Sequence, residues 1–269
     1  MSRARDEVTL EGGAAETSCD AFLDGRFKAY QPLNGPRAAI DALFLAAAIP
    51  ARAGGRETVL EAGLGVGVAS LALAARVSDA RVTGVEVQPG LCSLARENIA
   101  LNGMDERIAV VEANLASSPG ILKDAGLVPG SFSHVAANPP FLTRGHARVS
   151  PDRSIATAHA ADEGALEDWI KFLTRMAGKR ASLTLIHRAD ALDTLLGLLK
   201  GKFGGLTVFP LFPRAGAGAT RIIVCGTRGS RAPLELARGM VLHRADGGYS
   251  DEANAVLRDG EPLTAAPAR

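Results

Sequence analysis

The sequence predicts an α/β fold built on a mostly parallel β-sheet whose last strand runs antiparallel. Three observations lead to this fold class. The chain has 269 residues, of which 47% are apolar, which suits a folded domain and excludes a disordered or collagen-like chain. Short β-branched runs alternate with helical stretches, and the last two predicted strands lie too close together for a helix between them.

The overall charge and the cysteines exclude several classes of protein. Thirty basic and twenty-nine acidic residues leave a formal charge of +1, so a nucleic-acid partner would have to meet a local basic patch. The three cysteines, Cys19, Cys92 and Cys225, show no metal-ligand spacing, and we expect no metal site. The first twenty residues lack the apolar core of a signal peptide, and no apolar run could span a membrane, so we expect a cytoplasmic protein.

Residues 1–50 are expected to form an N-terminal segment and helix packed on the core. The first thirty residues are polar and irregular, which predicts a frayed start followed by a short docked strand or hairpin. A helix is predicted between Pro36 and Pro50, with one proline in its first turn and the other just past its end. Its apolar stripe consists of Ile40, Leu43, Phe44 and Ala47.

Residues 51–228 carry the alternating pattern of the main domain. The predicted elements are strands at 58–61, 81–87, 108–112, 132–137 and 182–186, and helices at 67–77, 90–101, around Trp169 and at 192–199. Strands near 206–211 and 221–225 are joined by a short segment containing Pro213 and Gly216, which predicts a closing hairpin. Residues 229–269 are rich in Arg, Gly and Pro, and we expect an irregular C-terminal extension.

A glycine-rich turn follows the first strand of the main domain. Gly63, Gly65 and Gly67 stand at relative positions 1, 3 and 5, whereas a dinucleotide fingerprint needs a glycine at position 6, where this chain has Val68. NAD is therefore disfavoured. Glycines without a Cβ atom allow a ligand close to the backbone, and N–H groups at a helix start favour a carboxylate. Taken alone, such a turn can also be only a tight turn.

Together with Glu61, the glycines resemble motif I of the S-adenosylmethionine-dependent methyltransferases, in which aspartate is commoner than glutamate at the acidic position. Glu86 ends the second strand, where a carboxylate can accept hydrogen bonds from two ribose hydroxyls, although a glutamate there is often only solvated. The resemblance places Asn114, after the third strand, at the adenine amino group of the cofactor. The order and spacing of these markers predict S-adenosyl-L-methionine as the cofactor.

The fourth strand ends in Asn138-Pro139-Pro140-Phe141. Two consecutive prolines stiffen the turn, so the Asn138 side chain and the Pro139 carbonyl have little freedom. The string resembles the N-P-P-Y/F signature of enzymes that methylate adenine N6, guanine N2 or a glutamine side chain. Two oxygen acceptors would draw a planar NH₂ group toward a pyramidal shape, and Phe141 would stack on the base. Alternatively, Asn138 only caps its own turn.

Some twenty-five residues without clear periodicity follow Phe141, and they include Arg144, Arg148 and Arg153. Loops of this length are often functional, and we expect these arginines to contact phosphates of a substrate RNA. The alternative is an exposed solubilising loop. Three histidines without partner spacing are expected to be structural: His134, His187 and His243.

Several strings together resemble one bacterial family, the tRNA adenine-N6 methyltransferases that modify valine tRNA beside the anticodon. The resemblance implies a Rossmann-like class I methyltransferase with a seven-stranded sheet, and it implies that Arg37 and Asp41 approach the methionine end of the cofactor. The strings are Gln31-Pro32, Gly35-Pro36-Arg37 ahead of Asp41, the glycine motif, the N-P-P-F motif, and Leu185-Ile186-His187-Arg188-Ala189-Asp190.

Three functions stay open at this point. The first is methylation of adenine N6 in a structured RNA, expected to be tRNA, with ribosomal RNA or DNA as other amino-group substrates. The second is methylation of a protein glutamine, for which that family leads one to expect a larger helical domain before the glycine motif. The third is a non-enzymatic binding module with the same fold.

Overall fold

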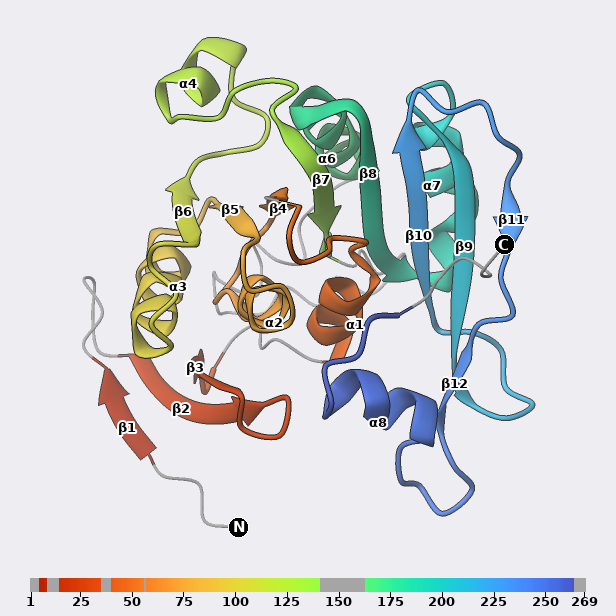
Figure 1. Ribbon diagram of the computed structural model, residues 1–269, viewed down its shortest axis with the longest axis horizontal. Helices are drawn as coiled ribbons and strands as arrows, with labels where there is room; N and C mark the ends of the chain where they lie inside the picture. The colour runs from red at the N-terminus through yellow and green to blue at the C-terminus, as the bar shows by residue number, and fades with distance from the viewer. Residues whose placement is uncertain (1–4, 9–14, 35–39, 56, 141–162, 264–269) are drawn as a thin grey trace.

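The computed structural model describes residues 5–8, 15–34, 40–55, 57–140 and 163–263. A nine-stranded sheet forms the centre of the molecule, and helices cover both of its faces (Figure 1). Apolar residues alternate between the two faces along each strand, as β10 shows: Ile223 belongs to one hydrophobic cluster, and Ile222 and Val224 belong to the other. The first cluster holds α1 and α2 against the sheet, and the second holds α6 and α7.

The order of the strands confirms the predicted class. Neighbouring strands follow the order β11-β9-β10-β8-β7-β4-β5-β6, and β12 also pairs with β9. Strands β4 to β8 are parallel to their neighbours among themselves, whereas β10 runs antiparallel to both β8 and β9. The strands are β4 (Thr58–Ala62), β5 (Arg81–Glu86), β6 (Ile108–Glu112), β7 (Phe132–Ala137), β8 (Ala177–Arg188), β9 (Phe203–Arg214), β10 (Arg221–Arg228), β11 (Glu235–Leu236) and β12 (Met240–His243).

The helices lie close to the predicted positions. They are α1 (Ile40–Ala48), α2 (Val68–Arg76), α3 (Pro89–Leu101), α4 (Pro119–Asp124), α6 (Glu163–Met176), the 3₁₀ turn η1 (Ala189–Ala191), α7 (Leu192–Leu199) and α8 (Asp251–Leu257). Helix α4 was not predicted, because six residues are too few to show a helical repeat. Among the described helices, none is long and apolar enough to cross a membrane.

The N-terminal segment contains a small sheet of its own. Instead of one short strand or hairpin, β1 (Arg5–Val8), β2 (Ala15–Phe22) and β3 (Phe27–Pro32) form three antiparallel strands. Strand β3 packs on α3 and α2, which places the small sheet beside these helices at the lower left of Figure 1. The side chains of Asn98 on α3 and of Asn102, which caps the carboxyl end of α3, bind the backbone of β3.

Within the described residues 229–263, the C-terminal extension contains two short strands and a helix, so the expectation of an irregular tail was wrong. Strands β11 and β12 pair in parallel with β9, and α8 packs on α1 and β12. Ser250 caps α8, because its hydroxyl accepts a hydrogen bond from the Ala253 N–H (3.1 Å). Strands of two and four residues are too short to produce an alternating pattern in the sequence. They form because their backbones pair with the free edge of β9. The domain boundaries at residues 50/51 and 228/229 stay predictions.

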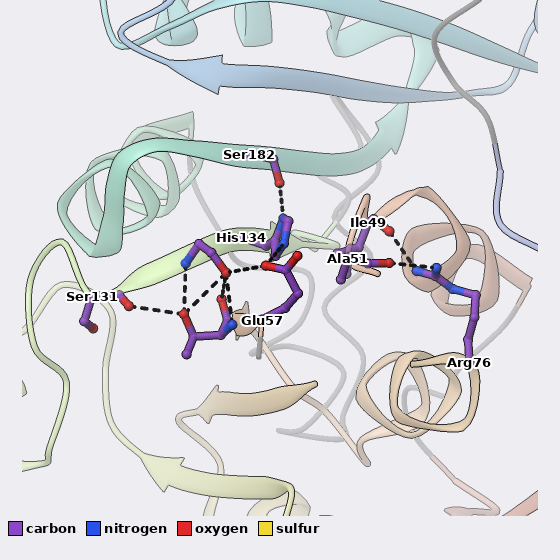
Figure 2. Close-up of polar contacts among 9 residues, drawn as sticks. Ile49, Ala51, Glu57, Arg76, Ser131, His134 and Ser182 are labelled. Carbon is purple, nitrogen blue, oxygen red and sulfur yellow. Dashed lines mark hydrogen bonds and ion pairs between the residues drawn. The ribbon is translucent and has the colours of Figure 1, made fainter. Parts of the chain in front are cut away.

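A polar cluster lies at the amino ends of β4 and β7 (Figure 2). His134 Nδ1 lies 2.6 Å from Ser182 Oγ, and His134 Nε2 lies 3.0 Å from Glu57 Oε2. Burial lowers the pKa of His134. Both ring nitrogens have protein partners at the edge opposite to the glycine turn, which is consistent with a structural role for this histidine.

Candidate active site

The register of the sheet brings the glycine turn and the Asn-Pro-Pro corner together. Ala62 on β4 pairs with Ala137 on β7, so the residues that follow them, Gly63 and Asn138, leave adjacent strands at the same level. On the other side, Ala62 pairs with Val85 on β5, and Glu86 follows. Parallel strands therefore present the predicted motifs at one edge of the sheet, where open α/β sheets bind ligands.

The glycine turn has the conformation that its sequence predicts. Gly63, Gly65 and Gly67 have φ values of 70°, 56° and 89°, which disfavour residues with a Cβ atom. The carbonyl of Val85 accepts hydrogen bonds from the N–H groups of Gly63 (2.8 Å) and Leu64 (3.0 Å). These bonds fix the start of the turn against β5.

Two of the glycines have different surroundings. A Cβ atom at Gly65 would meet no atom of the described residues within 4 Å, so this part of the structure leaves space there for a ligand against the backbone. A Cβ atom at Gly63 would instead lie 2.9 Å from Cζ3 of Trp169 on α6, and closer still to Cη2. Gly65 thus matches the expected open cradle, whereas Gly63 makes room for a protein side chain.

Glu86 holds the turn from the end of β5. Its Oε2 accepts a hydrogen bond from the Gly65 N–H (2.9 Å), and its Oε1 accepts from the N–H groups of Val87 (2.9 Å) and Gln88 (3.0 Å). A carboxylate offers about four acceptor positions, so the backbone leaves about one for a ribose hydroxyl, rather than the two assumed from sequence. Only 7% of Glu86 is exposed.

Glu61 is buried one residue before the end of β4. The Ser70 hydroxyl on α2 donates a hydrogen bond to its Oε2. Burial raises the pKa of Glu61 to about 8, the nearby Glu86 carboxylate also raises it, and the Ser70 hydrogen bond opposes the shift. At neutral pH this side chain is therefore largely protonated and joins β4 to α2.

Asn138 presents an acceptor without a hydrogen-bond partner among the described residues. Its Oδ1 is buried and makes no hydrogen bond with any part of the chain that the structure describes. Pro139, the next residue, is buried as well. Buried polar atoms without partners are rare in folded proteins and call for a specific explanation, such as a ligand group that they are placed to bind. Asn138 follows β7 at the level where Gly63 follows β4, and its role in the site stays a prediction.

Two further predicted residues have protein partners. The carboxylate of Asp41, at the start of α1, accepts a hydrogen bond from Arg221 Nε (3.0 Å) at the start of β10, and this pair ties α1 to the sheet. The Asn114 Oδ1 accepts a hydrogen bond from the Ala116 N–H (2.9 Å) and so closes a turn. A cofactor role for either residue stays a prediction.

Five predicted site residues lie outside the described residues: Arg37, Phe141, Arg144, Arg148 and Arg153. Conversely, the sequence analysis did not predict a role at this edge for Trp169 or for Asn98. The fact that Trp169 is the only tryptophan was a weak signal, and nothing in the sequence distinguishes Asn98 from any other helical asparagine.

Comparisons with known proteins agree with this arrangement. Residues 59–150 match a family model described as a methyltransferase domain. A solved structure of a predicted O-methyltransferase from Agrobacterium tumefaciens is 26% identical and has a TM-score of 0.71, with 85% of this chain and 100% of that chain covered.

Two curated relatives differ in how much of their length is matched. A tRNA1(Val) (adenine(37)-N6)-methyltransferase from Aeromonas hydrophila is 26% identical over 72% of this chain and 77% of its own length. A release factor glutamine methyltransferase from Deinococcus radiodurans is 39% identical, but over 35% of this chain and only 30% of its own length.

The sheet order, the glycine turn and these matches define a class I S-adenosylmethionine-dependent methyltransferase. Within that class, the chain is similar to curated proteins named tRNA1(Val) (adenine(37)-N6)-methyltransferase. The residues present fit the cofactor, because Gly65 leaves an open cradle and Glu86 keeps an acceptor position beside it.

Proposed function

We propose that this enzyme methylates the exocyclic N6 of an adenine in RNA, with tRNA as the substrate. The observation that carries the proposal is the buried Oδ1 of Asn138, which lacks a partner among the described residues and lies next to the glycine turn. The relatives named for adenine methylation of tRNA support it, since they match half or more of this chain.

The chemistry of an exocyclic amine explains why an orphaned acceptor is useful here. The lone pair of the amine is delocalised into the base, which makes the nitrogen a poor nucleophile. In the proposed complex, Asn138 Oδ1 and the Pro139 carbonyl each accept one N–H hydrogen bond. These bonds orient the NH₂ group and favour a pyramidal nitrogen whose lone pair faces away from the corner. Diproline stiffness holds both acceptors in place before the substrate arrives.

S-adenosylmethionine supplies an electrophilic methyl group attached to a sulfonium sulfur. In the overall reaction the nitrogen forms a bond to this carbon, the carbon–sulfur bond breaks, and the nitrogen releases one proton to water. No side chain has to act as a strong base, because the methylated nitrogen is acidic until it loses this proton. We assign Gly65 and Glu86 to cofactor binding, and Gly63, Gly67 and Glu61 to shaping the turn. Phe141, if it stacks on the target base, completes the site.

We also propose that Arg144, Arg148 and Arg153 contact RNA phosphates. Replacing each by glutamine should weaken RNA binding and lower the slope of log affinity against log salt by about 0.7 to 0.9 per lost phosphate contact. Arg52, on an exposed turn before β4, offers a control substitution. Unchanged slopes in all three variants would contradict the assignment. Because the proposed substrate is tRNA, we also propose a cytoplasmic location for the enzyme.

A second candidate, methylation of a protein glutamine, is favoured by the 39% identity to the release factor enzyme. Its amide NH₂ could meet the same two acceptors. Transfer of a radiolabelled methyl group to total RNA and to total protein separates the candidates, with Asn138→Ala as the inactive control. Label in RNA, recovered as N6-methyladenosine by mass spectrometry, is expected. Label in protein alone would reverse the assignment, and no label in either would favour a binding module.

A further inference from the structure

A buried asparagine links the small N-terminal sheet to the glycine turn. Asn98, on α3, is fully buried. Its Oδ1 accepts a hydrogen bond from the Tyr30 N–H of β3 (2.7 Å), and its Nδ2 donates to the Tyr30 carbonyl (3.0 Å). The same Nδ2 donates a second hydrogen bond to the carbonyl of Val66 (2.9 Å), which lies between Gly65 and Gly67.

A second asparagine, directly after the end of α3, provides a comparison within the molecule. Asn102, one helical turn later, accepts from the Lys28 N–H (3.0 Å) and donates to the Lys28 carbonyl (2.7 Å). Four residues of a helix rise about 6 Å, and two residues of a strand rise about 6.6 Å. Side chains four residues apart can therefore reach the backbone of every second residue of β3, here Tyr30 and Lys28. Asn98 and Asn102 thus bind β3 in the same way, but only Asn98 also binds the glycine turn.

Other side chains cannot reproduce the hydrogen bonds that Asn98 makes. Both amide hydrogens and one lone pair of the oxygen are used, and each partner is a backbone group. An aspartate of the same size would place carboxylate oxygens against two carbonyl oxygens. Removing the amide would leave the Val66 carbonyl, one residue after Gly65, without this donor.

We propose that Asn98 is a positioning residue for cofactor binding, and that through it the N-terminal sheet is coupled to the cofactor site. Glu86 holds the Gly65 N–H from β5 while Asn98 holds the Val66 carbonyl from α3, so both sides of one short segment are fixed by side chains. The inference rests on the assignment of the cofactor and not on the identity of the methylated substrate. Binding is reciprocal, so the cofactor should also stabilise the docking of β3.

The mutational test compares Asn98 with Asn102 by calorimetric titration of S-adenosylhomocysteine. Asn98→Ala and Asn98→Asp should each raise the dissociation constant about tenfold, as expected for one lost hydrogen bond in a buried turn. Asn102→Ala should change it by less than about twofold. For variants that stay active, KM for the cofactor should rise while kcat at saturation stays close to that of the wild type. Equal losses in the Asn98 and Asn102 variants, or none in either, would overturn the proposal.

A second measurement uses the wild-type protein and does not depend on how the variants fold. Amide hydrogen exchange is followed with and without S-adenosylhomocysteine. The Tyr30 N–H, whose acceptor is Asn98, should exchange more slowly when the ligand is bound, together with amides of the glycine turn. Ligand protection limited to the turn, with no change at β3, would show that the sheet is not coupled to the site. Neither measurement requires RNA, so failure of the substrate proposal would leave both results unchanged.

Discussion

The indole of Trp169 lies against the Cα of Gly63, so that even one added methyl group on the glycine would overlap the ring. Trp169 belongs to α6, on the other side of the sheet from α2, which begins after the glycine turn. The first glycine of the turn therefore packs against a protein side chain, while Gly65 is the one that leaves space for a ligand.

This contact predicts a strong and specific effect of Gly63→Ala. The methyl group would overlap the indole, and φ of 70° adds strain, so unfolding free energy should fall by about 2 to 5 kcal/mol. Trp169→Leu in the same chain should remove the overlap, so the double variant should be more stable than the sum of the single effects implies. Urea denaturation of all four proteins measures this. Additive effects would show that the ring does not limit the glycine.

Gly65→Ala should separate stability from cofactor binding. A methyl group there meets no atom within 4 Å in the part of the chain that the structure describes, so only the backbone strain of φ 56° should lower stability, by about 1 to 2 kcal/mol. The same methyl group would occupy the cradle, and the affinity for S-adenosylhomocysteine should fall tenfold or more, which is about 1.4 kcal/mol or more. Calorimetry of the folded variant tests this. Affinity equal to that of the wild type would mean that the cofactor does not lie against Gly65.

Asn138→Ala should lower kcat about a hundredfold or more, by analogy with the loss of other preorganised polar groups, and leave cofactor affinity nearly unchanged. Because Oδ1 has no partner among the described residues, the melting temperature should not fall. Asn138→Asp keeps an acceptor oxygen and should retain more activity. Glu86→Ala should instead mainly weaken cofactor binding, since it removes three backbone contacts and the free acceptor. Parallel losses of binding and turnover in both alanine variants would refute this division of roles.

Glu61 predicts a particular pH dependence of stability. Its pKa is about 8 in the folded state, well above the ordinary value of 4.5, so the folded protein binds an extra proton between these pH values. The stability that this proton contributes is fully present below pH 4.5 and is lost as pH rises through 8. The unfolding free energy of Glu61→Gln, taken relative to that of the wild type, should rise by roughly 2 to 5 kcal/mol from pH 5 to pH 9. Denaturation at both pH values tests this, and a constant difference would contradict it.

Replacement of Arg76 should lower the stability of the fold without changing a residue of the candidate active site. Its guanidinium, on α2, donates to the carbonyls of Ala46 (3.0 Å), Ile49 (2.7 Å) and Ala51 (3.2 Å) at the end of α1, and the last two bonds are drawn in Figure 2. Arg76→Met should lower unfolding free energy by about 2 to 4 kcal/mol, because carbonyls at a helix end lose their donors. Arg76→Lys should recover part of this. A loss below about 0.5 kcal/mol in the methionine variant would contradict the capping role.

The predicted elements came largely from local patterns. Alternating strand and helix patterns predicted β4 to β8 and, apart from α4, the helices between them, and a linker too short for a helix predicted the antiparallel β10. The same local logic located Gly65 and Asn138, because strand ends, glycine spacing and consecutive prolines are visible in sequence. Local patterns failed for β11, β12 and α8, which are short.

The sequence by itself determined the class of fold and the edge of the sheet where the motifs meet, because both follow from periodicity or from residues adjacent in the chain. The type of chemistry came from the resemblance of the glycine and Asn-Pro-Pro-Phe motifs to those of methyltransferases. The tertiary structure decided which residues contact one another. Trp169 packs against Gly63, and the side chains of Asn98 and Arg221 bind Val66 and Asp41. Backbone N–H groups donate to Glu86. Contacts between distant residues depend on helix packing and strand register, and one sequence carries no local signal for them.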